Sequence, residues 1–401
     1  MSSLPKPILI SGGGLAALLL ARSLKRSNIP FLLFERDASI VFRAQGYRLR
    51  LSAVGLDAIE AVLGPEGFNK FYDACGKTAG AGFAAIDPLT GETLGVQHES
   101  VSKEALTSRQ GKIVGISRGD MRSLFLEGCE EHIRWNHRVT GYELTASGVH
   151  AIFADESKSE EGSMLVGGDG IHSLVSKQLS RGAIKVYDTG SRGIHGQAPT
   201  TAFKDLGEGV FRFVDDTTQP NGGKVFLITN VRAGDMDDPS VNFGWTMGGT
   251  PGVIQIPNND YTIIGKPAAA IAKSLTAHWH PRVKPLFDNM LEDDAAFWKI
   301  TCSSPDGVPE WPNEPRVTLI GDAVHATTPA GGNGANTAVR DSALLGKLLA
   351  EAAAEGKEGW EGVTAAYEKE MRIYGSEVVK ESYAQAQSAF GANIDASTPT
   401  I

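Results

Sequence analysis

The segment that most constrains the fold of this chain is residues 317–346, VTLIGDAVHATTPAGGNGANTAVRDSALLG. It begins with a short apolar run containing β-branched residues, which predicts a buried strand. A loop with Pro329 and three glycines follows, and from Ala335 alanine and leucine recur at helical spacing. The N-terminus of a helix offers unpaired N–H groups and about half a positive charge. The segment therefore predicts a strand, a glycine-rich loop and a helix that together hold an anionic ligand.

A second segment of this kind lies near the N-terminus. The apolar residues 7–11 are followed by GGGLAA, which starts at Gly12, and then by a helical run up to residue 27. The next apolar run, residues 31–34, ends at Glu35, 23 positions after Gly12. A G-x-G-x-x-A motif between a strand and a helix, with an acidic residue at this distance, is typical of a dinucleotide site. Without this context, the glycines would indicate only a tight turn.

A third strand end of similar composition is LVGGDGIHS, residues 165–173. By itself it would be an ordinary junction of strand, turn and helix. The three junctions together, in this order, resemble the fingerprints of the group A flavoprotein monooxygenases of the para-hydroxybenzoate hydroxylase type. The segment from Gly321-Asp322 to Asp341 is close to that family's pattern. The segment ISRGDMR, residues 116–122, is similar to its flavin-contacting arginine segment. In its compact length and in the sequence YEKEM at residues 367–371, the chain is most similar to the tetracycline-inactivating branch of this family and to its fungal secondary-metabolite enzymes.

This resemblance implies an α/β fold with a Rossmann-like FAD-binding domain, an antiparallel-sheet substrate domain and C-terminal helices. We expect the FAD-binding domain to comprise residues 1–75, 101–180 and 301–360. Residues 76–100 and 181–300 would form the substrate domain, with strands at residues 209–214, 223–229, 241–247 and 261–264 and helices at 268–278 and 283–291. Residues 361–401 would form a helix and a tail whose last dozen residues are loosely held.

The resemblance also implies the reaction and its cofactors. We expect an enzyme that binds FAD, takes electrons from NADPH or NADH, and uses O2 through a flavin C4a-hydroperoxide to oxygenate an aromatic or polycyclic small molecule. No second G-x-G-x-x-G occurs, so the nicotinamide would dock transiently. The resemblance assigns FAD contacts to Gly12, Gly14, Leu15, Ala16, Glu35, Arg36, Arg43, Gly46, Arg118, Asp169, Asp322, Pro329, Gly334, Ala335 and Asn336.

Two residues and one short segment suggest a catalytic or metal-binding role, and each can also be explained by a structural role. Arg192 is the candidate catalytic residue, because a strand over the flavin could direct its guanidinium at a substrate oxygen. His325 follows the Gly-Asp motif, but a structural role is the stronger interpretation. The sequence His278-Trp279-His280 suggests a metal pair, but residues two apart on a helix do not share a face. We therefore predict no metal site.

The overall composition limits the partners. With a net charge of −9, the chain is a poor candidate for binding nucleic acid or an anionic membrane surface, which both need basic patches. Three cysteines without C-x-x-C spacing predict free thiols in a reducing compartment, so we expect the cytosol. The sequence contains no apolar run of 18 residues, so we predict no membrane span. We expect a monomer or a weak dimer.

Two other functions remain open at this level. The same fold could serve an oxidase or a dehydrogenase that inserts no oxygen, whereas a halogenase is disfavoured because its Gly-Trp-x-Trp-x-Ile-Pro motif is absent. The chain could also hold a flavin without turnover. Fold and cofactor do not determine the substrate.

Overall fold

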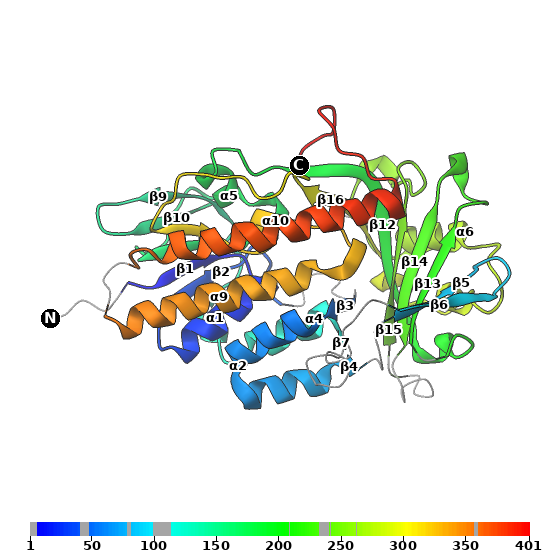
Figure 1. The fold of residues 1–401 in the computed structure, drawn as a ribbon, viewed down its shortest axis with the longest axis horizontal. Helices are drawn as coiled ribbons and strands as arrows, with labels where there is room; N and C mark the ends of the chain where they lie inside the picture. Colours follow the sequence, from blue (N-terminus) through cyan, green and yellow to red (C-terminus); the bar gives the residue numbers. More distant parts are fainter. Residues whose placement is uncertain are drawn as a thin grey trace.

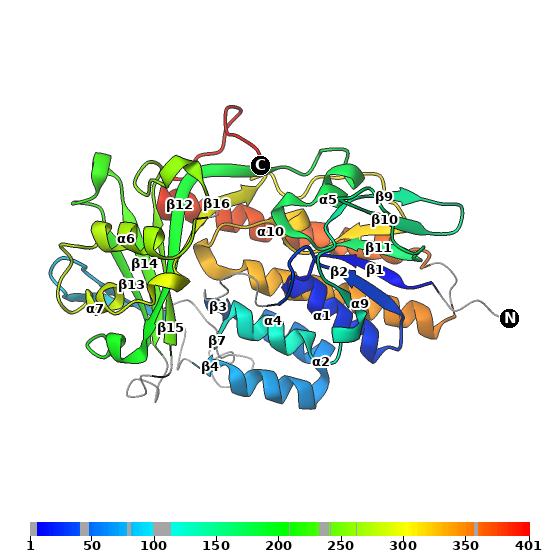
Figure 2. The ribbon, with the colours of Figure 1, turned by 180° about the vertical axis from the view of Figure 1, so that it is seen from behind.

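The computed structural model describes residues 6–40, 48–77, 82–98, 114–207, 209–231, 240, 242–261, 263–356 and 360–401. Arg43 and Gly46, two of the predicted FAD contacts, lie outside these ranges. The described chain has two halves side by side, a parallel-sheet half and a mainly antiparallel-sheet half, shown in Figures 1 and 2. Each half has its own apolar core.

The parallel-sheet half is built on five strands in the order β17-β11-β1-β2-β8. They are β17 (Val317–Leu319), β11 (Met164–Gly167), β1 (Ile8–Ser11), β2 (Phe31–Phe34) and β8 (Ile133–Arg134). All neighbours pair in parallel, and β1, β11 and β17 are fully buried. The continuous apolar runs in the sequence reflect this burial on both faces. Because parallel strands end at one edge, the three glycine-containing junctions converge there.

Helices cover this sheet and connect it with the other half. Helix α1 (Leu15–Arg26) packs against α9 (Gly334–Ala354), and α2 (Ala53–Ala74) and α4 (Arg118–Leu126) lie beside them. Helix α10 (Val363–Phe390) runs beside α9 and reaches the antiparallel sheet, as Figure 1 shows. Smaller elements complete this half: β3 (Arg48–Leu51), β4 (Gly76–Lys77), β7 (Val114–Ser117), β9 (Val139–Leu144), β10 (Val149–Phe153), α5 (Leu174–Leu179) and α8 (Asp322–His325).

The second half is a seven-stranded sheet in the order β16-β12-β15-β14-β13-β5-β6. Its strands are β16 (Ala296–Ser303), β12 (Val186–Pro199), β15 (Asn242–Gly249), β14 (Val225–Val231), β13 (Gly209–Asp215), β5 (Gly82–Ile86) and β6 (Thr93–His98). Only β13 and β5 pair in parallel among the described strands. One face packs on α6 (Lys266–Leu275) and α7 (Pro285–Asp288) around Trp245, Trp279 and Phe287.

Several predicted elements of this half were wrong. Residues 261–264 contain only an isolated bridge between Ile264 and Ala296 in the described part, and the helix predicted at 283–291 is reduced to the four residues of α7. Strand β16 was not predicted, and β12 was anticipated only as a strand that carries Arg192. The last residues are not loose: Asp188 N–H donates to Pro399 (2.9 Å) and Ile401 N–H donates to Val186 (3.0 Å), so this tail pairs with β12.

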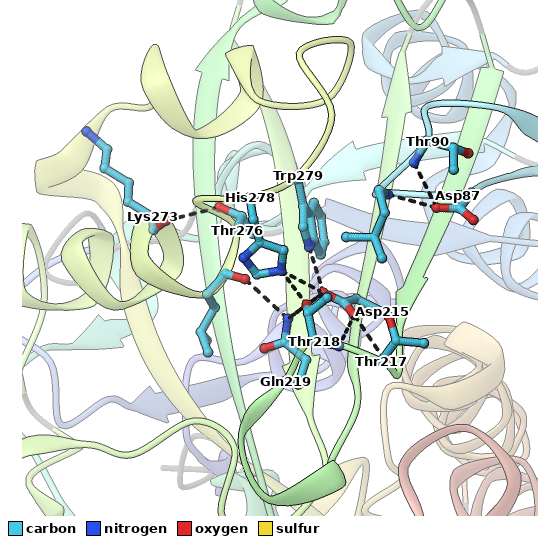
Figure 3. A network of polar contacts seen from close by, with 12 residues as sticks. Asp87, Thr90, Asp215, Thr217, Thr218, Gln219, Lys273, Thr276, His278 and Trp279 are labelled. Atoms are coloured by element: carbon cyan, nitrogen blue, oxygen red, sulfur yellow. Dashed lines mark hydrogen bonds and ion pairs between the residues drawn. The ribbon is translucent and has the colours of Figure 1, made fainter.

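The suggested metal pair belongs to a polar network, shown in Figure 3. The buried Asp215 carboxylate accepts hydrogen bonds from Gln219 Nε2 (2.6 Å) and Trp279 Nε1 (3.0 Å), and His278 Nε2 lies 3.3 Å away. Thr218 also donates to it (2.5 Å). Burial opposes ionisation of Asp215, but these donors outweigh it and lower its pKa. The described residues contain no cluster of three metal-binding side chains, and the network instead ties the end of β13 to the loop after α6.

No helix among the described residues is both long and apolar enough to span a bilayer.

Candidate functional site

A cleft of about 1970 Å³ lies between the two halves. Single small-molecule sites usually occupy about 300–1,000 Å³. The cleft is therefore large enough for two ligands together. Its walls come from the convergent strand ends, from α4, α9 and α10, and from one face of the seven-stranded sheet.

The glycine loop after β1 is closely packed against the end of β11. Gly12 has a φ of +92°, and a Cβ on it would lie 2.6 Å from the carbonyl oxygen of Gly168. The position thus requires glycine both for conformation and for space. Gly14 differs, because a Cβ there would come no closer than 3.7 Å to any other group. Gly14 leaves its free space on the cleft side, where a ligand can approach the backbone.

Two charged side chains fix this loop. Glu35 accepts hydrogen bonds from the N–H of Gly13 (2.5 Å) and of Asp37 (2.9 Å). Arg122, which is only 2% exposed, donates to the carbonyl oxygens of Gly13 (3.0 Å) and Ile40 (3.2 Å). The sequence did not reveal the role of Arg122, although its position four residues after Arg118, one helical turn later, was an available signal.

The helices that point at the cleft differ in how their N-termini are capped. Helices α1 and α9 have Gly14 and Asn333 at the N-cap and no side-chain cap. Their first N–H groups have no partner inside the helix. In α4 the cap is filled, because Ser117 accepts from the N–H of Asp120 (3.0 Å). The two uncapped ends both line the cleft through Leu15, Ala16, Gly334 and Ala335, and both favour anionic or polar ligand atoms.

Behind the junction at Gly321-Asp322 is a buried charged network. Asp341 accepts hydrogen bonds from Tyr374 (2.6 Å) and from the N–H of Gly321 (2.6 Å), and its Oδ2 lies 2.8 Å from Nε2 of His325. Burial alone would lower the pKa of His325, but the Asp341 carboxylate outweighs it and raises that pKa. His325 is 1% exposed and its ring faces Asp341. This geometry supports a structural role for His325 in holding the Gly321-Asp322 turn.

Arg118 connects the two walls of the cleft electrostatically. Asp322 is open to the cleft, yet the surrounding protein raises the pKa of its carboxyl, and the charges of His325 and Arg118 oppose this. On the sheet side, burial and the charge of Arg118 lower the pKa of His195 to about 4. The guanidinium therefore acts on both walls.

The residues that line the cleft fit FAD, as the following observations on the protein itself indicate. Oδ1 of Asp169 is buried and accepts no hydrogen bond among the described residues. Such an atom needs a donor, because burying an unpaired polar atom is costly. Ribose and ribityl hydroxyls are donors, and the uncapped helix ends suit phosphate and the flavin carbonyls. FAD is a dinucleotide, and the cleft of about 1970 Å³ is large enough to hold it.

The structure brings most of the predicted FAD contacts together. The residues that line the cleft are Gly12, Gly14, Leu15, Ala16, Glu35, Arg36, Arg118, Asp169, Asp322, Pro329, Gly334 and Ala335. Asn336 does not line it. The Asn336 side chain accepts from the N–H of Ser52 (2.9 Å) and donates to the carbonyl oxygen of Arg50 (3.1 Å), which joins α9 to the end of β3.

Arg192, the predicted catalytic residue, does not line the cleft. Its Nη1 and Nη2 donate to the two carboxylate oxygens of Asp188 (2.6 and 3.1 Å), and its guanidinium lies over the ring of Tyr261. Asp188 and Tyr261 line the cleft, but Arg192 does not. Direct contact between Arg192 and a substrate therefore finds no support in this geometry.

Comparisons with known proteins agree with the fold and with binding of FAD. The profile of the FAD-binding domain family matches residues 125–382. The dual O-methyltransferase/FAD-dependent monooxygenase elcB of Phaeosphaeria nodorum is 31% identical over 88% of this chain and 41% of its own length. The FAD-dependent monooxygenase nscC of Arthroderma otae is 25% identical over 90% of this chain and 89% of its own length. Klebsiella pneumoniae HpxO, complexed with FAD and uric acid, has a similar fold, with a TM-score of 0.75, 20% identity, and coverage of 96% and 89%.

The chain belongs to the FAD-binding domain family, and its fold is that of the para-hydroxybenzoate hydroxylase type. Both statements confirm what the three sequence fingerprints predicted. The chain spans less than half the length of the dual-function fungal relatives that it matches, and nearly all of nscC.

Proposed function

We propose that this chain is an FAD-dependent monooxygenase that uses NADPH or NADH and O2 to oxygenate an aromatic or polycyclic small molecule. The observation that carries the proposal is a cleft in which the glycine-containing strand ends face an aromatic-lined sheet. The names of the fungal relatives elcB and nscC, both FAD-dependent monooxygenases, support it. The uric acid bound by HpxO supports a flat heterocyclic or aromatic substrate.

In this proposal the chain binds FAD through its main-chain groups. The N-terminus of α1 holds the pyrophosphate, and Asp169 and Asp322 accept from sugar or ribityl hydroxyls. The N-terminus of α9, at Gly334 and Ala335, faces the part of the flavin where negative charge develops on reduction. When bound, FAD supplies the electron transfer and the activation of O2. The protein residues orient the two ligands and exclude water.

The nicotinamide nucleotide has a separate candidate approach. Arg36, Arg138, Lys299 and His172 all line the cleft, and burial and the charges of the three cations lower the pKa of His172. A local cluster of cations on a chain of net charge −9 suits a nucleotide phosphate. We propose that NADPH or NADH approaches here, without a second Rossmann site.

The remaining parts of the proposal concern the cellular compartment and the oligomeric state. The three cysteines are buried and form no disulfide, which supports a cytosolic protein. We propose a monomer or a weak dimer.

The test is spectroscopic. Purified protein is supplied with FAD, reduced anaerobically with NADPH, and then exposed to air with a panel of phenols and indoles. Ligand-accelerated bleaching followed by an oxygenated product supports the monooxygenase. Bleaching followed only by peroxide, with every ligand, would favour an oxidase. A stable flavin band that NADPH and NADH never bleach would favour a flavin-holding protein.

A further inference from the structure

One face of the seven-stranded sheet lines the cleft with a row of polar and apolar side chains. Register pairs Arg212 with Ile228, Ile228 with Thr246, and Thr246 with His195. Directly paired residues project from the same face of a sheet. All four line the cleft. The row therefore presents an imidazole and a hydroxyl side by side, on rigid strands opposite the strand ends of the other half.

The next row on the same face is aromatic. It pairs Phe226 with Gly248, Gly248 with Gly193, and Gly193 with Trp298. The two glycines leave space that the rings fill, because a Cβ on Gly248 would overlap the Phe226 ring and a Cβ on Gly193 would overlap the Trp298 indole. Both rings consequently lie down over the sheet.

This aromatic row continues into the other half. Phe390, at the end of α10, stacks on Phe226 with centroids 4.1 Å apart and planes 16° apart. The same apolar cluster includes Ala330, the residue after Pro329, and Trp298 packs against it. Because Pro329 is on the loop that leads into the α9 N-terminus, the aromatic wall is next to the place proposed for the flavin ring. A flat ring would fit against this wall, which we define as Phe226, Trp298 and Phe390.

We propose that His195 positions the substrate by accepting a hydrogen bond from a hydroxyl group on an aromatic ring system that lies against the aromatic wall. The proposal rests on the proposed function and deepens it, because it restricts the substrate class to hydroxylated arenes. Thr246, the cross-strand partner of His195, supplies a hydroxyl beside the same substrate group. His195 is a positioning residue here and takes no proton in the reaction.

The electrostatics agree with an acceptor role. Burial and the charge of Arg118 lower the pKa of His195 to about 4, so the ring is neutral near pH 7. A neutral imidazole has one acceptor nitrogen, whereas the imidazolium has none. The charged groups around this face are Arg212 on the same row, Arg118 from α4 and Asp322 from α8. Desolvation by the surrounding protein raises the pKa of Asp322, so its titration must be separated from that of His195.

The test compares 2-naphthol with 2-methylnaphthalene as ligands of the FAD-loaded protein by isothermal titration calorimetry. These probes differ chiefly in the hydroxyl. We expect the wild type to prefer 2-naphthol at least about tenfold. His195→Leu should abolish this preference and change the affinity for 2-methylnaphthalene less than about threefold. His195→Gln should restore part of the preference, because its amide oxygen accepts. His278→Gln, in the same half but away from the cleft, is the matched control and should behave as wild type.

The pH profile gives a second readout that a purely structural role would not move. The wild-type preference should be constant from about pH 5.5 to 8 and fall about twofold near pH 4, where half of the imidazole is protonated. In His195→Gln the preference should no longer fall, which separates His195 from Asp322. This variant also keeps the test decisive if His195→Leu does not fold.

Three results would overturn the proposal. They are a wild type with no preference for 2-naphthol, equal weakening of both ligands in His195→Leu, and an acid-induced loss that persists in His195→Gln. Failure of the proposed function is distinguishable, because FAD content is measured from the visible spectrum of the same samples. A wild type that holds FAD but shows no preference contradicts only the role of His195.

Discussion

The two halves of this molecule use glycine for opposite purposes. In the parallel-sheet half, Gly12 allows the main chain to approach the end of β11, and Gly14 leaves space at the N-terminus of a helix. In the antiparallel half, Gly193 and Gly248 allow the chain's own aromatic rings to lie over the sheet. One half thus exposes main-chain groups to a ligand, and the other presents side chains.

This difference explains what each half can recognise. Main-chain N–H groups at a helix end bind any phosphate or polar edge that reaches them, so they suit a cofactor shared by many proteins. Side chains on a rigid sheet carry the shape and the hydrogen-bonding pattern of one substrate class. Cofactor binding and substrate choice should therefore be separable by mutation.

The largest expected effect comes from Gly12→Ala. A Cβ there would meet the main chain of Gly168 and Asp169 at 2.6–2.7 Å, in a backbone conformation with φ of +92°. We expect the free energy of unfolding of the FAD-free protein to fall by about 3 kcal/mol or more. Gly14→Ala is the matched control. It should leave the melting temperature of the FAD-free protein within about 2 °C and raise the Kd for FAD at least tenfold. Equal melting temperatures for the two variants would contradict the distinction.

The next effect concerns the antiparallel half alone. Asp215→Asn removes the charge on which several donors converge, and we expect a loss of about 2–3 kcal/mol in urea unfolding. Its lowered pKa means that this stabilisation is present above the ordinary aspartate value of about 3.9 and is lost as the pH falls below it. The variant should lose less stability on acidification than the wild type. Unchanged FAD affinity is expected, and a large drop would show that the halves are coupled.

Gly248→Ala tests the aromatic wall. The added methyl group should push the Phe226 ring off the sheet toward Phe390, which already stacks on it. We expect the affinity for 2-naphthol to fall at least about tenfold, measured by calorimetry, with the Kd for FAD within about threefold. Loss of both affinities would indicate a general defect of the cleft.

The smallest effect is expected for Arg192→Gln. Its guanidinium binds Asp188 but does not line the cleft, and Lys299 still lies 3.2 Å from Asp188 in its absence. We expect about 1 kcal/mol of lost stability and ligand-dependent NADPH oxidation within about threefold of wild type. A hundredfold loss of turnover with normal FAD binding would instead restore the catalytic role that the sequence suggested.

The parallel-sheet half was predictable because its information is local. Strand, glycine loop and helix follow one another directly around Gly12, Asp169 and Asp322, and parallel pairing then brings their ends together. The antiparallel half was predicted less well. Strand β12, VYDTGSRGIHGQAP, has few apolar residues, and two of its polar residues, Asp188 and His195, line the cleft. Strand β16, AFWKITCS, did carry β-branched and aromatic residues, and this signal was missed.

The missed site residues are those defined by long-range contacts. Arg122 is 109 residues from Gly13, whose carbonyl it binds, and His195 joins the site only through the register of β12 with β15. Conversely, Asn336 was predicted from a local motif, but its side chain bonds to Ser52 and Arg50, nearly 290 residues away. Spacing in the sequence does not encode such partners.

The most direct test of the central claim is a titration of the purified protein with FAD, followed in the visible flavin band and repeated with 2-naphthol present. The account predicts one FAD per chain, and a further change in the band when 2-naphthol binds beside the flavin. A protein that takes up no FAD would contradict the assignment of the cleft. A flavin band that 2-naphthol leaves unchanged at saturation would contradict the shared cleft, in which one ligand lies against the other.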